Sequence, residues 1–147
     1  MTQEEKELLL KDLCGRLPYQ PLCKKVDTED DFCECNGPLG YSLRDLIDNK
    51  IIIKPYLRPM SSMTEEETKE IAILHDIKDI LSVNVTSDYI DVIVDDGVCS
   101  TERRTIWYDE MVSSIKCFDW LNKHHFDYRG LIEKGLALEA SEEIYNK

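Results

Sequence analysis

The amino-acid sequence predicts an α+β protein, a single small domain in which about three helices pack on a small, mainly antiparallel sheet. Apolar residues recur at helical spacing in three segments and alternate with polar residues in others. Short strand-forming runs are joined by hairpin turns, without the strand–helix–strand order of a parallel sheet. The length of 147 residues fits one domain. We expect that domain to span residues 1–140 and residues 141–147 to form a frayed C-terminal tail.

The first predicted element is a helix over residues 3–16. Thr2 and Glu5 have the spacing of a capping box, in which each side chain bonds the other residue's backbone amide. Apolar residues then follow on one stripe, at Leu9, Leu10, Leu13 and Leu17. Pro18 predicts the end of the helix.

Prolines, glycines and acidic residues interrupt the next segment and predict little regular structure. We expect a short strand over residues 22–26, followed by an acidic loop. A helical turn fits within residues 41–48. The β-branched run at residues 51–54 predicts another strand, which Pro55 is expected to end.

A second capping box, formed by Thr64 and Glu67, predicts the start of a helix over residues 65–81. The acidic residues in its first turn suit the positive end of the helix dipole. The apolar residues at helical spacing are Ile71, Leu74, Ile77 and Leu81.

Residues 83–107 have the pattern of antiparallel strands. Strands are predicted over residues 83–85 and 89–94, and the Asp-Gly pair at residues 96–97 predicts a hairpin turn before a return strand over residues 98–107. The residues expected on the buried face are Ile90, Val92 and Val94. A last helix is predicted over residues 110–123, with the stripe Met111, Ile115, Phe118 and Leu121.

The net charge of −12 repels phosphate backbones, so we expect no direct contact with nucleic acid. It suits a basic protein partner, and it equally suits plain solubility. No apolar run is long enough to cross a membrane. Residues 1–7 lack the features of a secretory signal, which predicts a cytoplasmic location and six cysteines in the thiol form.

Cys33 and Cys35 are weak candidates for metal ligands. Two thiolates flanking one residue can share a zinc ion, and His124 and His125 have suitable side chains to complete a tetrahedral set. Structural zinc sites usually have two such pairs, and only one cluster is present here. We therefore expect no metal and no cofactor.

The sequence favours a protein without catalytic residues. It contains no nucleophile elbow, no glycine-rich phosphate loop and no HExxH motif. Four aspartates surround the predicted hairpin: Asp88, Asp91, Asp95 and Asp96. Without the glycine-hinged loop of a calcium site, we interpret them as the solvated outer face of the sheet.

Two short segments combine tyrosine with arginine and are the candidate binding residues. These are Tyr56, Arg58, Asp127, Tyr128 and Arg129. Tyrosine and arginine are frequent at binding hot spots, and exposed arginines can hold an anionic ligand. The alternative is that the tyrosines pack in the core and the arginines pair with nearby acids.

Three blocks of the chain resemble a family of hypothetical proteins found in gut Bacteroidetes and in their phages and mobile elements. The blocks are LLLKDLCGRLPY at residues 8–19, KPYLRPMSSMTEEE at residues 54–67 and DWLNKHHFDYRGLIEKGLALEA at residues 119–140. Relatives tend to have glycine after the LPY, where this chain has Gln20. The resemblance implies an accessory protein that acts inside the bacterial cell, and it transfers no catalytic residue.

These observations favour a non-catalytic binding or regulatory protein of mobile-element or phage origin, such as an inhibitor of a host defence factor that acts through an acidic surface. The alternative is a binding protein for a small anionic ligand, such as a nucleotide messenger, that uses the arginines above. A small hydrolase is a weaker alternative.

Overall fold

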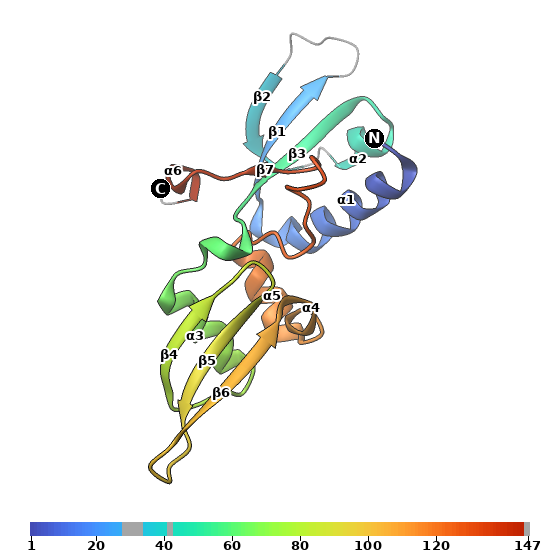
Figure 1. Cartoon of the computed structure of the whole chain (residues 1–147). Coiled ribbons are helices and arrows are strands. Elements are labelled where there is room, and N and C mark those ends of the chain that lie inside the picture. Colours follow the sequence, from blue (N-terminus) through green and yellow to red (C-terminus); the bar gives the residue numbers. More distant parts are fainter. Residues whose placement is uncertain (28–33, 41–42, 146–147) are drawn as a thin grey trace. The chain divides into compact units, whose positions relative to one another are not determined.

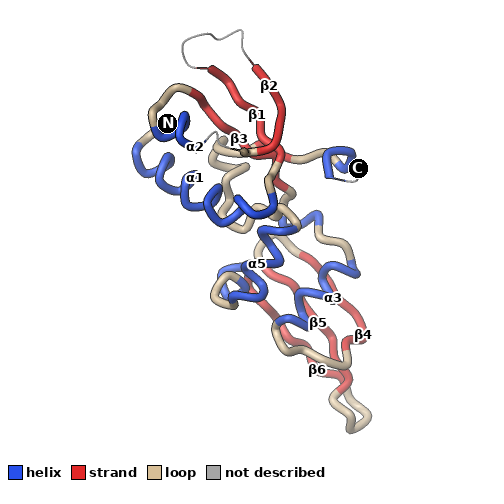
Figure 2. The backbone as a smooth tube through the Cα atoms, turned by 180° about the vertical axis from the view of Figure 1, so that it is seen from behind, coloured by secondary structure: helices blue, strands red, loops and turns tan. Residues whose placement is uncertain are grey.

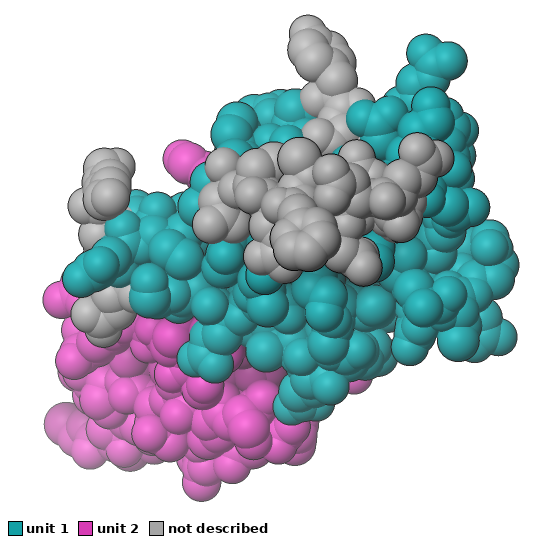
Figure 3. Space-filling view, turned by 90° about the horizontal axis from the view of Figure 1, so that it is seen from above, with its two compact units in different colours: residues 1–58, 125–147 teal, residues 59–124 magenta. Residues whose placement is uncertain are grey.

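The computed structural model describes residues 1–27, 34–40 and 43–145 (Figure 1). Its helices and strands confirm the α+β class. Residues 1–58 and 125–147 form one compact unit (unit 1), and residues 59–124 form another (unit 2), coloured separately in Figure 3. The strands lie in two sheets, whereas the sequence predicts one. A single domain over residues 1–140 stays a prediction, because two compact units occur both within one domain and in two.

Unit 1 begins with helix α1 (Gln3–Arg16), at the predicted bounds. The capping box is confirmed, since the Glu5 amide donates to Thr2 Oγ1 at 3.2 Å and the Thr2 amide donates to the Glu5 carboxylate at 2.6 Å. Leu9 and Leu13 are buried, as their place on the apolar stripe predicts. These leucines tie the helix to the core of the unit.

A short 3-10 helix, η1 (Leu17–Tyr19), follows α1 and ends at Gln20. Gln20 has a φ of 44°, in the left-handed region that glycine favours. Its side chain stabilises this turn, because Nε2 donates to the Leu17 carbonyl at 2.8 Å and Oε1 accepts the Gly40 amide at 2.9 Å. The turn therefore forms here without a glycine.

Four strands form the sheet of unit 1 in the order β2-β1-β3-β7. Their bounds are β1 (Leu22–Asp27), β2 (Glu34–Pro38), β3 (Ile51–Leu57) and β7 (Leu138–Glu139). The pairs are antiparallel except β3 with β7, which is parallel. Helix α2 (Leu43–Ile47) precedes β3, within the predicted helical turn.

Strand β3 continues through Pro55, so the prediction that Pro55 ends it is wrong. Pro55 pairs with Cys23 of β1, and the pairing with β7 starts only at Tyr56. Pro55 thus lies where β3 has one neighbouring strand, a place where the missing proline amide is tolerated.

The C-terminal segment differs from the frayed tail that the sequence predicts. Residues Glu142–Tyr145 form helix α6, and Tyr145 OH donates to the Tyr56 carbonyl at 2.5 Å. The Tyr145 ring stacks on His125 with 4.2 Å between centroids. One aromatic side chain therefore anchors this polar segment to the sheet.

Unit 2 contains a three-stranded antiparallel sheet of order β4-β5-β6, with helices on one face (Figure 2). The strands are β4 (Ile80–Val85), β5 (Tyr89–Asp95) and β6 (Thr101–Trp107). The helices are η2 (Met60–Ser62), α3 (Glu65–Leu74), α4 (Tyr108–Met111) and α5 (Ile115–Lys123). Ile90, Val92 and Val94 are buried, as their alternation predicts.

Helix α3 is shorter than the predicted helix over residues 65–81. Its capping box at Thr64 and Glu67 is present. The helix stops at Leu74, because Asp76 and Asp79 adopt positive φ angles of 60° and 56° that no α-helix continues through. Leu81, expected on the helical stripe, lies instead in β4 and is exposed.

The predicted helix over residues 110–123 is also interrupted. Residues 112–114 separate α4 from α5. Met111 and Leu121 are buried as expected, but Ile115 is 85% exposed, so its placement on the core stripe is wrong. Because the helix is broken, the residues of α5 do not continue the apolar stripe of α4 as they would in one continuous helix.

Candidate binding surfaces

The two segments that hold the predicted binding residues lie side by side in unit 1. Arg58 and Phe126 form an isolated parallel bridge. The Arg58 amide donates to the His125 carbonyl at 2.9 Å, and the Asp127 amide donates to the Arg58 carbonyl at 2.8 Å. The structure therefore brings together residues that are almost 70 positions apart in the chain.

Three of the candidate residues, Tyr56, Arg58 and Asp127, form contacts within unit 1 through the side chain or the backbone. The Arg58 guanidinium carbon lies 4.3 Å from the Phe126 ring centroid. The Tyr56 carbonyl accepts the Tyr145 hydroxyl. The Asp127 carboxylate accepts the backbone amides of residues 131 and 132, both at 2.8 Å. The two bonds to Asp127 stabilise the turn after Phe126.

Tyr128 and Arg129, which are half-buried, form a polar cluster with two buried residues of α1. The guanidinium carbons of Arg16 and Arg129 lie 5.2 and 5.0 Å from the Tyr128 ring centroid. Arg129 Nε is 3.3 Å from Asp12 Oδ1. Burial raises the pKa of the Tyr128 hydroxyl. An anionic ligand at Arg129 would have to compete with the carboxylate of Asp12.

Asp12 and Arg16 were not among the predicted site residues. An acidic and a basic residue four positions apart usually form an exposed helical pair, which carries little information. Their burial could have been predicted from their positions, because Leu9, Asp12, Leu13 and Arg16 have the spacing of one buried helix face. Both charged residues are fully buried.

The metal candidates are only partly within the described chain. Cys33 lies outside the described residues, as does the side chain of Cys35. His124 stacks on Trp120 with 4.1 Å between centroids, and His125 stacks on Tyr145. In the part of the chain that the structure describes, no three histidine, cysteine or acidic side chains are grouped to hold a metal ion.

The sheet of unit 2 has an outer face, opposite the buried Ile90, Val92 and Val94, that carries aromatic and charged side chains. We define this outer face by Tyr89, Asp91, Ile93, Arg103, Thr105 and Trp107. The register pairs Tyr89 with Trp107, Asp91 with Thr105 and Ile93 with Arg103. Cross-strand partners lie on the same side of a sheet, so these six side chains are neighbours.

The aromatic pair of the outer face is packed and yet accessible. The Tyr89 and Trp107 rings meet edge to face, with centroids 4.9 Å apart. Trp107 remains 46% exposed. Such a pair presents a large apolar area in a fixed orientation.

An ion pair lies beside these rings. Arg103 donates to Asp91, whose carboxylate also accepts the Thr105 hydroxyl at 2.7 Å. The Arg103 guanidinium and, secondarily, the Thr105 hydroxyl lower the pKa of Asp91, although burial acts in the opposite direction. The Asp91 carboxylate likewise raises the pKa of Arg103. The Arg103 side chain is 62% exposed, so it remains available for further contacts.

Exposed acids flank the outer face along the chain: Asp88, Asp95, Asp96, Glu102, Asp109 and Glu110. Asp91 and Asp95 lie opposite the buried Ile90, Val92 and Val94, as the alternation predicts, and Asp95 is exposed. The interpretation of Asp91 as solvated is wrong, because its side chain is buried against Arg103 and Thr105. The sequence pattern did not single out Tyr89, Arg103 or Trp107, whose positions opposite one another depend on the hairpin register.

Fold and surface together define a small acidic α+β protein with one sheet face that carries exposed aromatic and charged side chains. Comparison of the chain with protein-family models, with curated proteins and with solved structures finds no match. Among the residues that the structure describes, no helix combines the length and apolar character needed to cross a bilayer.

Proposed function

We propose that this chain is a non-catalytic binding protein that docks a basic protein partner on the outer face of the unit 2 sheet. The observation that carries the proposal is the exposure of Trp107 in contact with Tyr89, next to an accessible Arg103. Tryptophan, tyrosine and arginine are the residues most often found at interface hot spots. A partner that covers the Tyr89–Trp107 pair would bury aromatic surface that is now partly in water.

Charge indicates the kind of partner. The net charge is −12, and acids flank the strands that carry the aromatic pair. An apolar centre with a charged rim matches the anatomy of protein interfaces, and complementary charge accelerates association. A basic protein surface fits this arrangement, whereas a nucleic-acid backbone is repelled by it.

The biological setting of the proposal rests on the sequence resemblance. Relatives in gut Bacteroidetes, their phages and mobile elements suggest a regulatory protein of mobile origin that acts in the bacterial cytoplasm. Inhibition of a host factor, such as a defence protein, is the form of regulation that a small acidic binder supports best, because it can cover a basic functional surface.

The two alternatives receive less support. Binding of a small anion by Arg58, Tyr128 and Arg129 competes with existing contacts, in particular with the carboxylate of Asp12. Cys23 and Cys117 do not support a cysteine-dependent hydrolase, because such an enzyme needs a thiolate and burial raises the pKa of Cys23 to about 12 and also raises that of Cys117.

A pull-down from a Bacteroidetes host lysate, at low and at high salt, tests the proposal. The bait is the tagged full chain, compared with Trp107→Ala and with Ile115→Ala, which removes an exposed apolar side chain from α5. We expect a partner whose capture weakens with salt and falls at least ten-fold with Trp107→Ala, the effect of a hot-spot residue. Ile115→Ala should capture as much as the unaltered chain. Equal capture by Trp107→Ala would contradict the proposal.

A further inference from the structure

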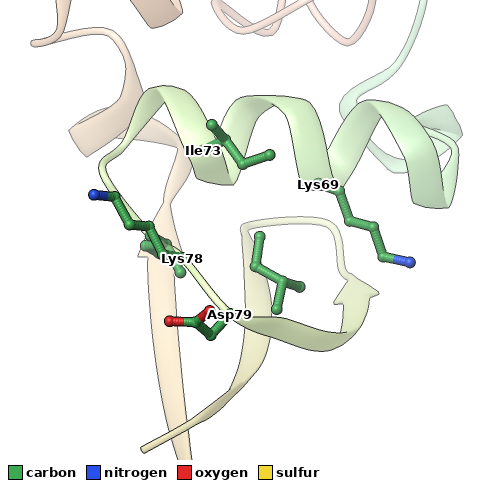
Figure 4. A pocket seen from close by; sticks show the side chains of 6 residues that line it. Lys69, Ile73, Lys78 and Asp79 are labelled. Carbon is green, nitrogen blue, oxygen red and sulfur yellow. The ribbon is translucent and has the colours of Figure 1, made fainter.

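Unit 2 contains a second exposed apolar feature, a groove between helix α3 and strand β4. The groove has a volume of about 410 Å³ and is lined by Lys69, Ile73, Ile77, Lys78, Asp79 and Ile80 (Figure 4). Ile73 projects from α3 and is 59% exposed. The isoleucines thus give the groove an apolar floor and wall on the helix-covered side of the sheet.

Strand β4, whose first residue Ile80 lines the groove, is an open sheet edge. In the described chain β4 pairs only with β5. Its sequence ILSVNV contains neither a charged residue nor a proline. The opposite edge, β6, carries Glu102, Arg103 and Arg104. Charged residues and prolines are the usual protection of an edge against added strands, so β4 lacks a protection that β6 has.

The pairing of β4 with β5 also leaves a regular stretch for a further strand. The register is irregular between Ile80 and Ser82 and continuous from Ser82 to Val85. A bulge at one end of an edge strand limits how far an added strand can extend. Four residues remain in register.

The rim of the groove is basic in a strongly acidic protein. Lys69 and Lys78 lie toward opposite ends of the groove, against one lining acid, Asp79 (Figure 4). Lys69 Nζ is 2.7 Å from Glu65, one helical turn away, in an exposed pair that contributes little stability. Lys78 is exposed and forms no ion pair with a residue that the structure describes. The two lysines favour a ligand with negative charge at its ends.

We infer that the groove binds an extended segment of a partner protein that has an apolar centre and acidic ends. The segment adds as a fourth strand along residues 82–85 of β4, so that its backbone bonds the open edge. Alternate apolar side chains contact Ile73 and Ile77, and its acidic ends approach Lys69 and Lys78. Strand addition of this kind takes affinity from the backbone and specificity from the side-chain groove.

A second copy of the chain fits this edge less well, because it would bring the same two lysines, Lys69 and Lys78, against the groove. The inference is independent of the outer face, since none of the groove-lining residues belongs to that face.

The test uses a fluorescein-labelled probe peptide, Glu-Glu-Val-Thr-Val-Thr-Val-Glu-Glu, and a control peptide with lysine in place of each glutamate. Fluorescence anisotropy with the full chain should show saturable binding of the acidic probe and at least ten-fold weaker binding of the lysine peptide. Amide exchange at residues 82–85 should slow in the presence of the acidic probe, because the edge amides gain partners.

Matched variants locate the binding. Ile73→Glu should weaken binding of the acidic probe at least ten-fold, and Lys78→Glu should weaken it several-fold. Ile115→Glu, which places the same charge on an even more accessible isoleucine of α5, should leave it unchanged. Circular dichroism checks that each variant is folded.

Three results would overturn the inference. The first is equal binding of the acidic and the lysine peptide. The second is unchanged binding of the acidic probe to Ile73→Glu. The third is a dimer of the chain, seen by light scattering, that Ile73→Glu dissociates. Trp107→Ala should bind the probe normally. A failure of the outer-face proposal is therefore distinguishable from a failure of the groove.

Discussion

Arg16 Nε lies 2.7 Å from Asp12 Oδ2, one helical turn away in α1, and both side chains are fully buried. Arg16 Nη2 also donates to the carbonyl of Phe126, 110 residues further along the chain, at 2.7 Å. The pair therefore joins the first helix of unit 1 to the segment that follows residue 124. Removal of one partner of a buried ion pair is costly, because the other charge then stays buried without compensation.

Removal of the carboxylate should strongly destabilise unit 1. Asp12→Ala leaves the Arg16 guanidinium buried without its counter-charge, and we expect a loss of about 3–5 kcal/mol in the free energy of unfolding. Urea denaturation followed by circular dichroism measures it.

The double variant Asp12→Leu/Arg16→Met serves as the control for this prediction. It replaces both charges by apolar side chains, so it should recover most of the lost stability. A loss of less than about 1 kcal/mol in Asp12→Ala would show that the pair contributes no more than an exposed one.

The cysteines should separate into reactive and protected classes. Cys14 and Cys99 are exposed, whereas Cys23 and Cys117 are buried. Burial raises the pKa of Cys23 to about 12, and the thiolate is the form that reacts. With iodoacetamide near neutral pH, peptide mapping should find Cys14 and Cys99 alkylated before Cys23 and Cys117.

The buried pair should react only after urea is added, since unfolding both exposes the thiols and restores their ordinary pKa. Alkylation of Cys23 at the rate of Cys14 in the folded protein would contradict the burial of this strand residue.

The stability of unit 2 should depend on pH through Asp91. The Arg103 guanidinium lowers the pKa of this carboxyl in the folded state. Its contribution is therefore fully present above the unfolded value of about 4 and disappears as the pH falls through the lowered folded value. Asp91→Asn should lower the free energy of unfolding by about 1 kcal/mol at pH 7, and this difference should shrink toward pH 2.

Melting curves from pH 7 to about pH 2 follow this difference. Glu133→Gln is the matched control, because Glu133 is exposed and forms no ion pair with any described residue. A difference between Asp91→Asn and the unaltered chain that stays constant over this range would mean that the carboxylate charge is not what stabilises the sheet.

The sequence by itself determined the elements that depend on neighbours along the chain. Both capping boxes, at Thr2 and at Thr64, form within four residues, so the starts of α1 and α3 were predictable. The hairpin between β5 and β6 follows from the Asp-Gly pair, in which Gly97 takes a φ of 75°. The alternation of apolar and polar residues along β5 identified Ile90, Val92 and Val94 as its buried apolar residues, because alternate residues of a strand lie on the same face.

Only the tertiary structure decided which distant segments pair. β2 forms although its sequence contains glycine and proline, because the backbone of β1 supplies its hydrogen bonds. The contact of Arg58 with Phe126, the burial of Arg16 and the anchor at Tyr145 all join residues far apart in sequence. Periodicity reports which face of an element is apolar, but it carries no information about the partner that covers that face. The candidate residues in unit 1 could therefore be chosen from the sequence by residue type alone. The residues of the outer face of unit 2 could be identified only once the pairing of its strands was known.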